Sequence, residues 1–134
     1  MGLDQAVTGI VAGVGFRAAT TSEEIVALVR RALHAAGLAP DALTALATAT
    51  DRAGEPNFLG AAAAFGVRPR GIEPAALTAA DARVVTRSVR IATSRGVGSV
   101  AEAAALAAAG SGARLILPRI VSAGATCALA QAPG

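Results

Sequence analysis

The stretch VTGIVAGVGFRAATTSEE, residues 7–24, decides how the rest of this chain is expected to fold. Its apolar first half predicts a strand over residues 6–12, and its polar second half predicts the start of a helix. Gly13 and Gly15 between them predict a turn, from which Arg17 projects. Backbone N–H groups at a helix start have no intrahelical partners and favour anions, so this stretch predicts an anion site at a strand-to-helix turn.

The remaining chain alternates between helix and strand patterns. Thr21 and Glu24 have the spacing of a capping box, and apolar residues recur at helical spacing from there until Gly37 ends the helix. Residues 81–98 fit a helix better than a strand. Pro118 cannot donate to a strand ladder, which predicts a position at a sheet edge or strand end. The other expected elements are strands at residues 43–49 and 67–72, helices that begin at Pro56, Pro74 and Ser99, and an antiparallel hairpin of residues 115–117 and 125–130.

Strands that alternate with helices predict a three-layer α/β/α fold with a mixed, mainly parallel sheet and a C-terminal antiparallel hairpin. The length of 134 residues fits a single domain of residues 1–134. In sheets of this kind, ligands bind beyond the carboxyl ends of the strands. We therefore expect residues 13–17, residues 51–55 and the pair Pro118-Arg119 to meet at one rim of the sheet.

Composition excludes several classes of protein. Hydrophobic residues make up 54% of the chain, but no uninterrupted apolar run approaches the roughly 20 residues of a membrane helix, and the N-terminus lacks a signal-peptide pattern. We expect a cytoplasmic protein without a membrane contact. A lone histidine and a lone cysteine, His34 and Cys127, exclude a disulfide within the chain and predict no metal site. His34 is expected to be solvated in the last turn of its helix, and Cys127 is expected to be buried.

The glycine pattern and the charge argue against nucleotides and nucleic acids. Ala18 stands where a Rossmann fingerprint needs its third glycine, and a P-loop needs a lysine, which this chain lacks, so no cofactor is expected. All twelve basic residues are arginines, and residues 68–95 hold six of them against two acids. These arginines fit either an acidic partner or a solvated face. The overall charge is only +3 and Tyr and Trp are absent, so a small polyanion is a better partner than nucleic acid.

A catalytic role can be given only to carboxylates at the expected rim. Asp51 and Glu55 are the candidates for a general base, with Arg17 as an electrostatic partner. A carboxylate beside an arginine is a poorer base, because the positive charge stabilises its ionised form. The residues alone therefore leave enzymatic activity open.

Four groups of residues follow one another in an order that matches a known family. They are Gly13-Val14-Gly15-x-Arg17 before the helix start, Leu46-Ala47-Thr48 followed by Glu55-Pro56, Ser99-Val100-Ala101-Glu102-Ala103-Ala104-Ala105, and Leu115-Ile116-Leu117-Pro118-Arg119 with Thr126-x-Ala128-x-Ala130. On these residues the chain resembles the CobE/CbiG C-terminal domain family of cobalamin biosynthesis, over nearly its whole length. Phe16 stands where the family commonly has cysteine, Ala19-Thr20 where it has a Gly-Thr or Gly-Ser pair, and Arg52 where it has lysine. Phe16 removes any thiol chemistry, and Arg52 keeps the charge but changes its shape.

The resemblance implies a role in building the corrin ring. The family domain occurs alone in the aerobic pathway, or fused behind other domains in a protein that opens the lactone ring of a cobalt-precorrin, and this chain looks like the standalone form. The implied ligand is a precorrin, a tetrapyrrole rich in acetate and propionate groups, and arginine binds carboxylates through paired charge-assisted bonds. The expected ligand-binding residues are Gly13, Gly15, Arg17, Thr20, Arg52 and Arg119.

Three functions remain open at this point. The first is a precorrin carrier or accessory factor that works with other cobalamin-biosynthesis enzymes. The second is a precorrin-modifying enzyme, such as a lactone hydrolase acting on precorrin-5A or its cobalt form, with Asp51 or Glu55 as the base. The third is a general anion-binding or nucleotide-binding module.

Overall fold

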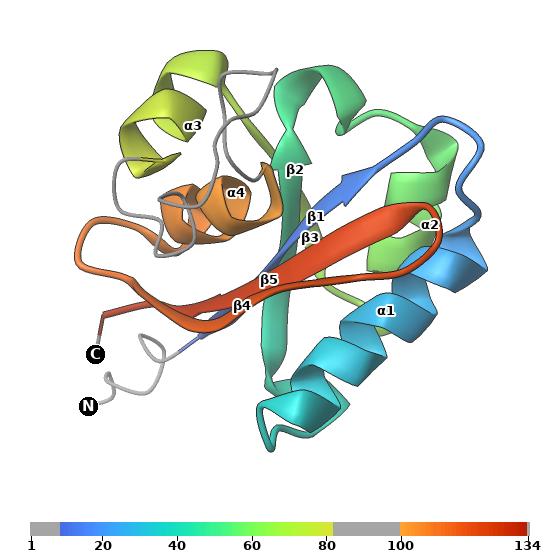
Figure 1. The fold of residues 1–134 in the computed structure, drawn as a ribbon, viewed down its shortest axis with the longest axis horizontal. Helices are drawn as coiled ribbons and strands as arrows, with labels where there is room; N and C mark the ends of the chain where they lie inside the picture. The colour runs from blue at the N-terminus through green and yellow to red at the C-terminus, as the bar shows by residue number, and fades with distance from the viewer. Residues whose placement is uncertain (1–8, 82–99, 134) are drawn as a thin grey trace.

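Five strands form one mixed sheet in the computed structural model, which describes residues 9–81 and 100–133 (Figure 1). The strands are β1 (Ile10–Phe16), β2 (Leu43–Ala49), β3 (Arg68–Ile72), β4 (Arg114–Val121) and β5 (Ala125–Gln131). Their order across the sheet is β3-β2-β1-β5-β4. β1 and β3 run parallel to β2, whereas β5 runs antiparallel to both β1 and β4. The predicted mixed sheet with a C-terminal antiparallel hairpin is confirmed.

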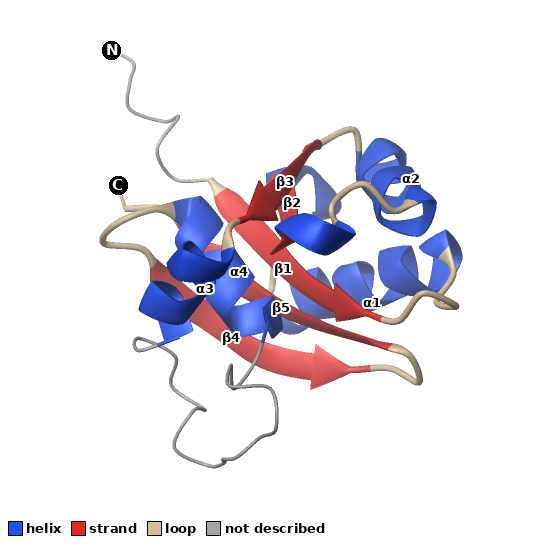
Figure 2. Cartoon of the chain, turned by 90° about the horizontal axis from the view of Figure 1, so that it is seen from above, coloured by secondary structure: helices blue, strands red, loops and turns tan. Residues whose placement is uncertain are grey.

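Two helical layers enclose this sheet (Figure 2). The helices are α1 (Ser22–Ala35), α2 (Pro56–Phe65), α3 (Pro74–Asp81) and α4 (Val100–Ala109). α1 and α2 cover one face, and α3 and α4 cover the other, as Figures 1 and 2 both show. The predicted three-layer α/β/α arrangement is therefore confirmed. Residues 82–98 of the segment expected to be helical lie outside the described residues, as does Ser99, where the last helix was expected to begin.

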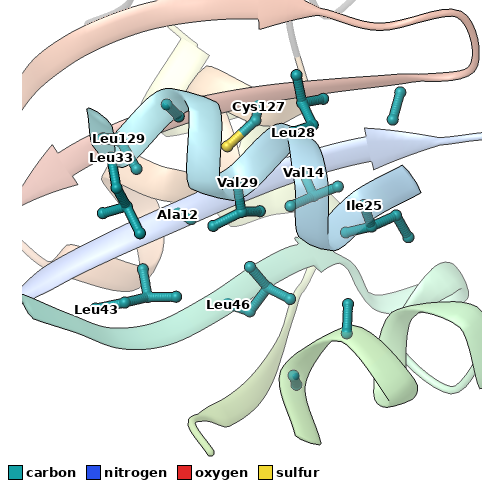
Figure 3. Close-up of a cluster of buried hydrophobic side chains, with 14 of the residues drawn as sticks. Ala12, Val14, Ile25, Leu28, Val29, Leu33, Leu43, Leu46, Cys127 and Leu129 are labelled. Atoms are coloured by element: carbon teal, nitrogen blue, oxygen red, sulfur yellow. The ribbon is translucent and has the colours of Figure 1, made fainter. Parts of the chain in front are cut away.

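The core between the sheet and the layer of α1 and α2 contains most of the large buried side chains (Figure 3). Ile25, Leu28, Val29 and Leu33 of α1 lie over the side chains of β1, β2 and β5. These residues form the apolar stripe that the helical spacing predicted. Burying a side chain of this size stabilises a fold by roughly 1.5–3 kcal/mol. The stripe therefore fixes α1 against the sheet.

The ends of α1 and α2 follow local signals in the sequence. Thr21 is the N-cap of α1, and its side chain accepts a 3.1 Å hydrogen bond from the N–H of Glu24. Pro56 is the first residue of α2, where its missing N–H costs nothing. Gly37 after α1 and Gly66 after α2 have φ angles of 76° and 68°, a conformation that glycine adopts without strain. The predicted helix boundaries at Thr21, Gly37 and Pro56 are confirmed.

The predicted turn at Gly13 and Gly15 is wrong, because β1 continues through both glycines to Phe16. Gly13 serves helix packing instead. A Cβ atom on Gly13 would collide with the carbonyl oxygen of Ala101 and would lie 2.6 Å from the nitrogen of Ala105, both in α4. The absent side chain lets α4 pack directly onto β1. The turn into α1 begins only after Phe16.

The second core, between the sheet and the layer of α3 and α4, is built mainly from alanine. The buried residues of α4 are Ala101, Glu102, Ala103, Ala104, Ala105 and Leu106. Small side chains let a helix lie close to a sheet, and a closely packed interior leaves no room for larger ones.

Both edges of the described sheet contain a proline. Pro118 lies in β4 at one edge, where the register with β5 shifts between Leu117 and Ile120. Pro69 lies in β3 at the other edge. A proline cannot donate a ladder hydrogen bond, so an edge strand is where it is tolerated. The predicted edge position of Pro118 is confirmed.

Candidate functional site

The carboxyl ends of β1 and β2 and the turn between β4 and β5 lie at the same end of the strands, and we call this end of the sheet the rim. It consists of residues 17–21, 50–55 and 122–124. Figure 2 shows the arrowheads of β1 and β4 at this end of the sheet. Parallel pairing of β1 with β2 brings Arg17 and residues 51–55 to the same rim.

Arg17 is exposed at the end of β1, and two acceptors fix its backbone. Its N–H donates to the carbonyl oxygen of Gly124 at 3.3 Å and to the hydroxyl of Thr20 at 3.1 Å. Within residues 9–81 and 100–133, no ion pair or hydrogen bond engages its guanidinium group. The backbone of Arg17 is therefore held while its charged end remains accessible to solvent.

Thr20 holds the same loop. Its side chain is 7% exposed, and its hydroxyl donates to the carbonyl oxygen of Gly124 at 2.7 Å. The carbonyl oxygen of Thr20 accepts a 2.7 Å hydrogen bond from the side-chain amide of Asn57 in α2. The single hydroxyl proton of Thr20 is used inside the protein, which suits a residue that orders the loop. Ligand binding by Thr20 stays a prediction.

Arg52 lies over an aromatic pair. Its guanidinium carbon is 5.4 Å from the ring centroid of Phe16, and that ring stacks on Phe58 with 5.9 Å between centroids and 3° between planes. A guanidinium group over an aromatic face is held by cation–π attraction and keeps N–H donors at its edge for a carboxylate. Sequence reasoning treated Phe16 only as a missing thiol and did not foresee this platform.

Glu24 turns its carboxylate to the hairpin, not back to its own helix start as a capping box would require. The oxygen Oε2 accepts hydrogen bonds from the hydroxyl of Ser122 at 2.5 Å and from the N–H of Gly124 at 2.7 Å. The Ser122 hydroxyl, then the Gly124 N–H, lower the pKa of Glu24 below its ordinary value, and the positive charge of Arg17 adds to this effect. Glu24 thus joins α1 to the turn between β4 and β5.

We expect the Glu24→Gln variant to lose stability mainly near neutral pH. A carboxylate whose pKa is lowered by folding contributes its full stability above its unfolded pKa, about 4.3, and this contribution is lost as the pH falls through the folded pKa. The difference in melting temperature between wild type and Glu24→Gln should be largest at about pH 7 and shrink toward about pH 3. Thermal melts followed by circular dichroism measure it, with Glu23→Gln as the control. An equal difference at both pH values would contradict this prediction.

The two predicted catalytic carboxylates also lie at the rim. Asp51 is exposed in the 3-10 turn Thr50–Arg52, and Glu55 is half-buried as the N-cap residue of α2. Within the part of the chain that the structure describes, no hydrogen bond or ion pair joins either carboxylate to Arg17. Their role as a general base stays a prediction.

Arg119 lies away from the rim, contrary to the expectation for Pro118-Arg119. It precedes Ile120, which lies level with Val14 across the sheet. Arg119 is therefore about four residues, or roughly 13 Å, short of Arg17 along the strand direction. The strand was expected to end near the proline, but the shifted register lets β4 continue past it. A ligand-binding role for Arg119 stays a prediction.

Glu102 is a buried carboxylate in a segment for which the sequence predicted only a helix that begins at Ser99. It is fully buried in α4, and its Oε2 accepts a 3.0 Å hydrogen bond from the N–H of Arg119. Glu102 thereby ties the irregular part of β4 to α4. The signal that could have marked it is a single charged residue in a run of alanines, because a buried carboxylate requires polar partners.

Comparison with protein families matches residues 10–130 to the family described as Cobalamin synthesis G C-terminus. The chain belongs to this family. The match runs from the first residue of β1 to within β5, so it spans all five described strands. The resemblance drawn from the sequence motifs is confirmed, and the chain is a cobalamin-biosynthesis protein of the CobE/CbiG-like type.

Three relatives in this family align with nearly the whole chain. A Sinorhizobium protein named Protein CobE is 43% identical over 126 residues, which are 94% of this chain and 82% of that protein. The crystal structure of CobE, a protein from the cobalamin biosynthetic pathway, is 30% identical and has a TM-score of 0.81 over 92% of this chain and 90% of that one. The crystal structure of cobalamin biosynthesis protein chiG from Agrobacterium tumefaciens is 38% identical and has a TM-score of 0.74 over 93% of this chain and 99% of that one.

The thiol of Cys127 and the metal-binding side chains of the described residues remain to be considered. Cys127 lies buried in β5, and burial raises the pKa of its thiol to about 12, which makes it a poor nucleophile. Among the described residues, no group of three histidine, cysteine, aspartate or glutamate side chains could hold a metal ion. None of the described helices has the length and apolar character needed to cross a membrane.

Proposed function

We propose that this protein binds a precorrin at the rim and serves as a carrier or accessory factor in cobalamin biosynthesis. The observation that supports this most is the pair of arginines at the rim, Arg17 and Arg52, which follow neighbouring parallel strands. Within residues 9–81 and 100–133, no carboxylate forms an ion pair with either guanidinium group. Two cations that lack such a counter-ion favour an anionic ligand.

The chemistry of a precorrin suits this arrangement. Its acetate and propionate groups surround one large ring, so several carboxylates arrive together. One carboxylate can accept two parallel N–H donors from a guanidinium group, which is a stronger contact than a neutral hydrogen bond. Arg52 already lies against the Phe16 ring, so less side-chain freedom is lost when it binds. Two arginines that directly follow adjacent strands can hold two carboxylates of the same ring.

A carrier role fits the described side chains better than covalent chemistry does. Cys127 is buried with a raised thiol pKa, and Phe16 puts an aromatic ring at the rim instead of a thiol. A carrier passes its ligand to the next enzyme. We therefore also propose other cobalamin-biosynthesis enzymes as transient partners.

Mixing the purified protein with precorrin intermediates, one at a time, tests this proposal through the visible absorption spectrum and the mass of the recovered tetrapyrrole. A carrier should shift the absorption of the bound intermediate and leave its mass unchanged. The absence of a spectral shift, together with no co-elution in gel filtration for any intermediate, would rule the proposal out.

A lactone hydrolase is the second candidate, and the position of Glu55 favours it. Its side chain is half-buried at the start of α2 and makes no capping hydrogen bond there, so its carboxylate could accept a proton from water. Hydrolysis of a lactone adds one water to the mass of the tetrapyrrole. If that product appears, the hydrolase replaces the carrier, and comparing Glu55→Gln with Asp51→Asn would identify the base.

A further inference from the structure

The loop that carries Arg17 is tied to the turn between β4 and β5 by a connected set of hydrogen bonds, which we call the clasp. The carbonyl oxygen of Gly124 accepts from the N–H of Arg17 at 3.3 Å and from the hydroxyl of Thr20 at 2.7 Å. The N–H of Gly124 donates to Glu24 at 2.7 Å, and the hydroxyl of Ser122 donates to the same carboxylate oxygen at 2.5 Å. A single residue, Gly124, therefore connects Glu24 to Arg17.

The space around Gly124 shows how closely the clasp is packed. A Cβ atom there would lie 2.8 Å from Oγ1 of Thr20 and 3.5 Å from Oε2 of Glu24. A side chain at this position would push apart the residues that the hydrogen bonds join. The loop after β1, the first turn of α1 and the hairpin turn thus form one packed unit.

We propose that Glu24 is a positioning residue that holds Arg17 in place for ligand binding, acting through Gly124. This inference rests on the proposed function of the rim. Glu24 need not touch the ligand, because its carboxylate fixes the hairpin turn and the turn fixes the backbone of Arg17. The opposite charges of Glu24 and Arg17 also attract each other, which supports the hydrogen bonds of the clasp.

Absorption titration of a precorrin with wild type, Glu24→Ala, Glu24→Gln and Glu23→Ala tests this inference. Glu23 is the matched control, because it is an exposed glutamate in the same first turn of α1. We expect Glu24→Ala to raise the dissociation constant about tenfold and Glu23→Ala to change it by less than about twofold. Glu24→Gln should fall between them, because an amide oxygen still accepts hydrogen bonds from the turn.

A double variant separates positioning from a general loss of structure. If Glu24 acts through Arg17, Glu24→Ala should weaken binding little further when Arg17→Ala is already present. A purely structural loss would weaken binding by the same factor in both backgrounds. That outcome, or wild-type affinity in Glu24→Ala, would overturn the inference.

Amide hydrogen exchange tests, independently of ligand binding, whether Glu24 orders the loop of Arg17. If wild type binds no intermediate, the proposed function is wrong, and the exchange rate of the Arg17 amide becomes the deciding measurement. Faster exchange of this amide in Glu24→Ala than in Glu23→Ala supports Glu24 as the residue that orders the loop. Equal rates in the two variants overturn it.

Discussion

Gly13→Ala is expected to lower the free energy of unfolding by about 3 kcal/mol or more, although it adds a single methyl group. A Cβ atom at this position would collide with the carbonyl oxygen of Ala101 and approach the nitrogen of Ala105 to 2.6 Å. Both atoms belong to the backbone of α4. The helix cannot move away without separating its buried alanine face from the sheet, and a flexible side chain that could yield is not at the contact.

Thermal unfolding followed by circular dichroism measures this effect, which corresponds to a fall in melting temperature of about 10 °C. Gly54→Ala is the matched control, because a Cβ atom at Gly54 would meet nothing within 4 Å and the backbone there needs no positive φ. We expect Gly54→Ala to stay within about 0.5 kcal/mol of wild type. If Gly13→Ala proved as stable as Gly54→Ala, the close packing of α4 on β1 would be wrong.

Elements whose signals are local were predictable from the sequence. β2 has the predicted bounds, residues 43–49, and α2 begins at the predicted Pro56 and ends before Gly66. A proline in the first helical turn and a glycine with positive φ each act on a few neighbouring residues, so a short window of sequence contains the whole signal. The family was likewise identified from short motifs that lie in order along the chain.

Gly13 shows why the end of β1 could not be predicted in the same way. A glycine next to an apolar run fits a turn and a close backbone contact equally well. The neighbour that decides between them is Ala101, which only tertiary packing brings to β1. Glu24 is a similar case, since its partners Ser122 and Gly124 lie 98 and 100 residues away in the sequence.

The position of the rim was predictable in part. The rule that ligands bind at the carboxyl ends of strands correctly predicted that Arg17 and Arg52 share one end of the sheet, because β1 and β2 are parallel neighbours. It failed for Arg119, because an edge strand can shift its register and continue past a proline. The stacking of Phe16 on Phe58 was also beyond reach, because the two rings come from different elements.

Arg17→Ala is expected to weaken precorrin binding about 10- to 100-fold while leaving the free energy of unfolding within about 0.5 kcal/mol of wild type. A charge-assisted pair of hydrogen bonds to a carboxylate is lost, and the backbone N–H that holds the loop is kept. Within the described residues the guanidinium group makes no hydrogen bond or ion pair, so little folding energy is removed with it. Absorption titration and a thermal melt of the same sample measure both quantities.

Arg17→Lys and Arg68→Ala decide whether the geometry or only the charge of Arg17 matters. Lysine keeps the charge but lacks the planar pair of donors, so its affinity should fall between wild type and Arg17→Ala. Arg68 begins β3 beside Ala45, near the end of the sheet opposite the rim, so Arg68→Ala removes the same charge without touching the rim and should bind like wild type. If Arg17→Ala and Arg68→Ala weakened precorrin binding equally, net charge alone would attract the ligand. That result would contradict the rim as the binding site.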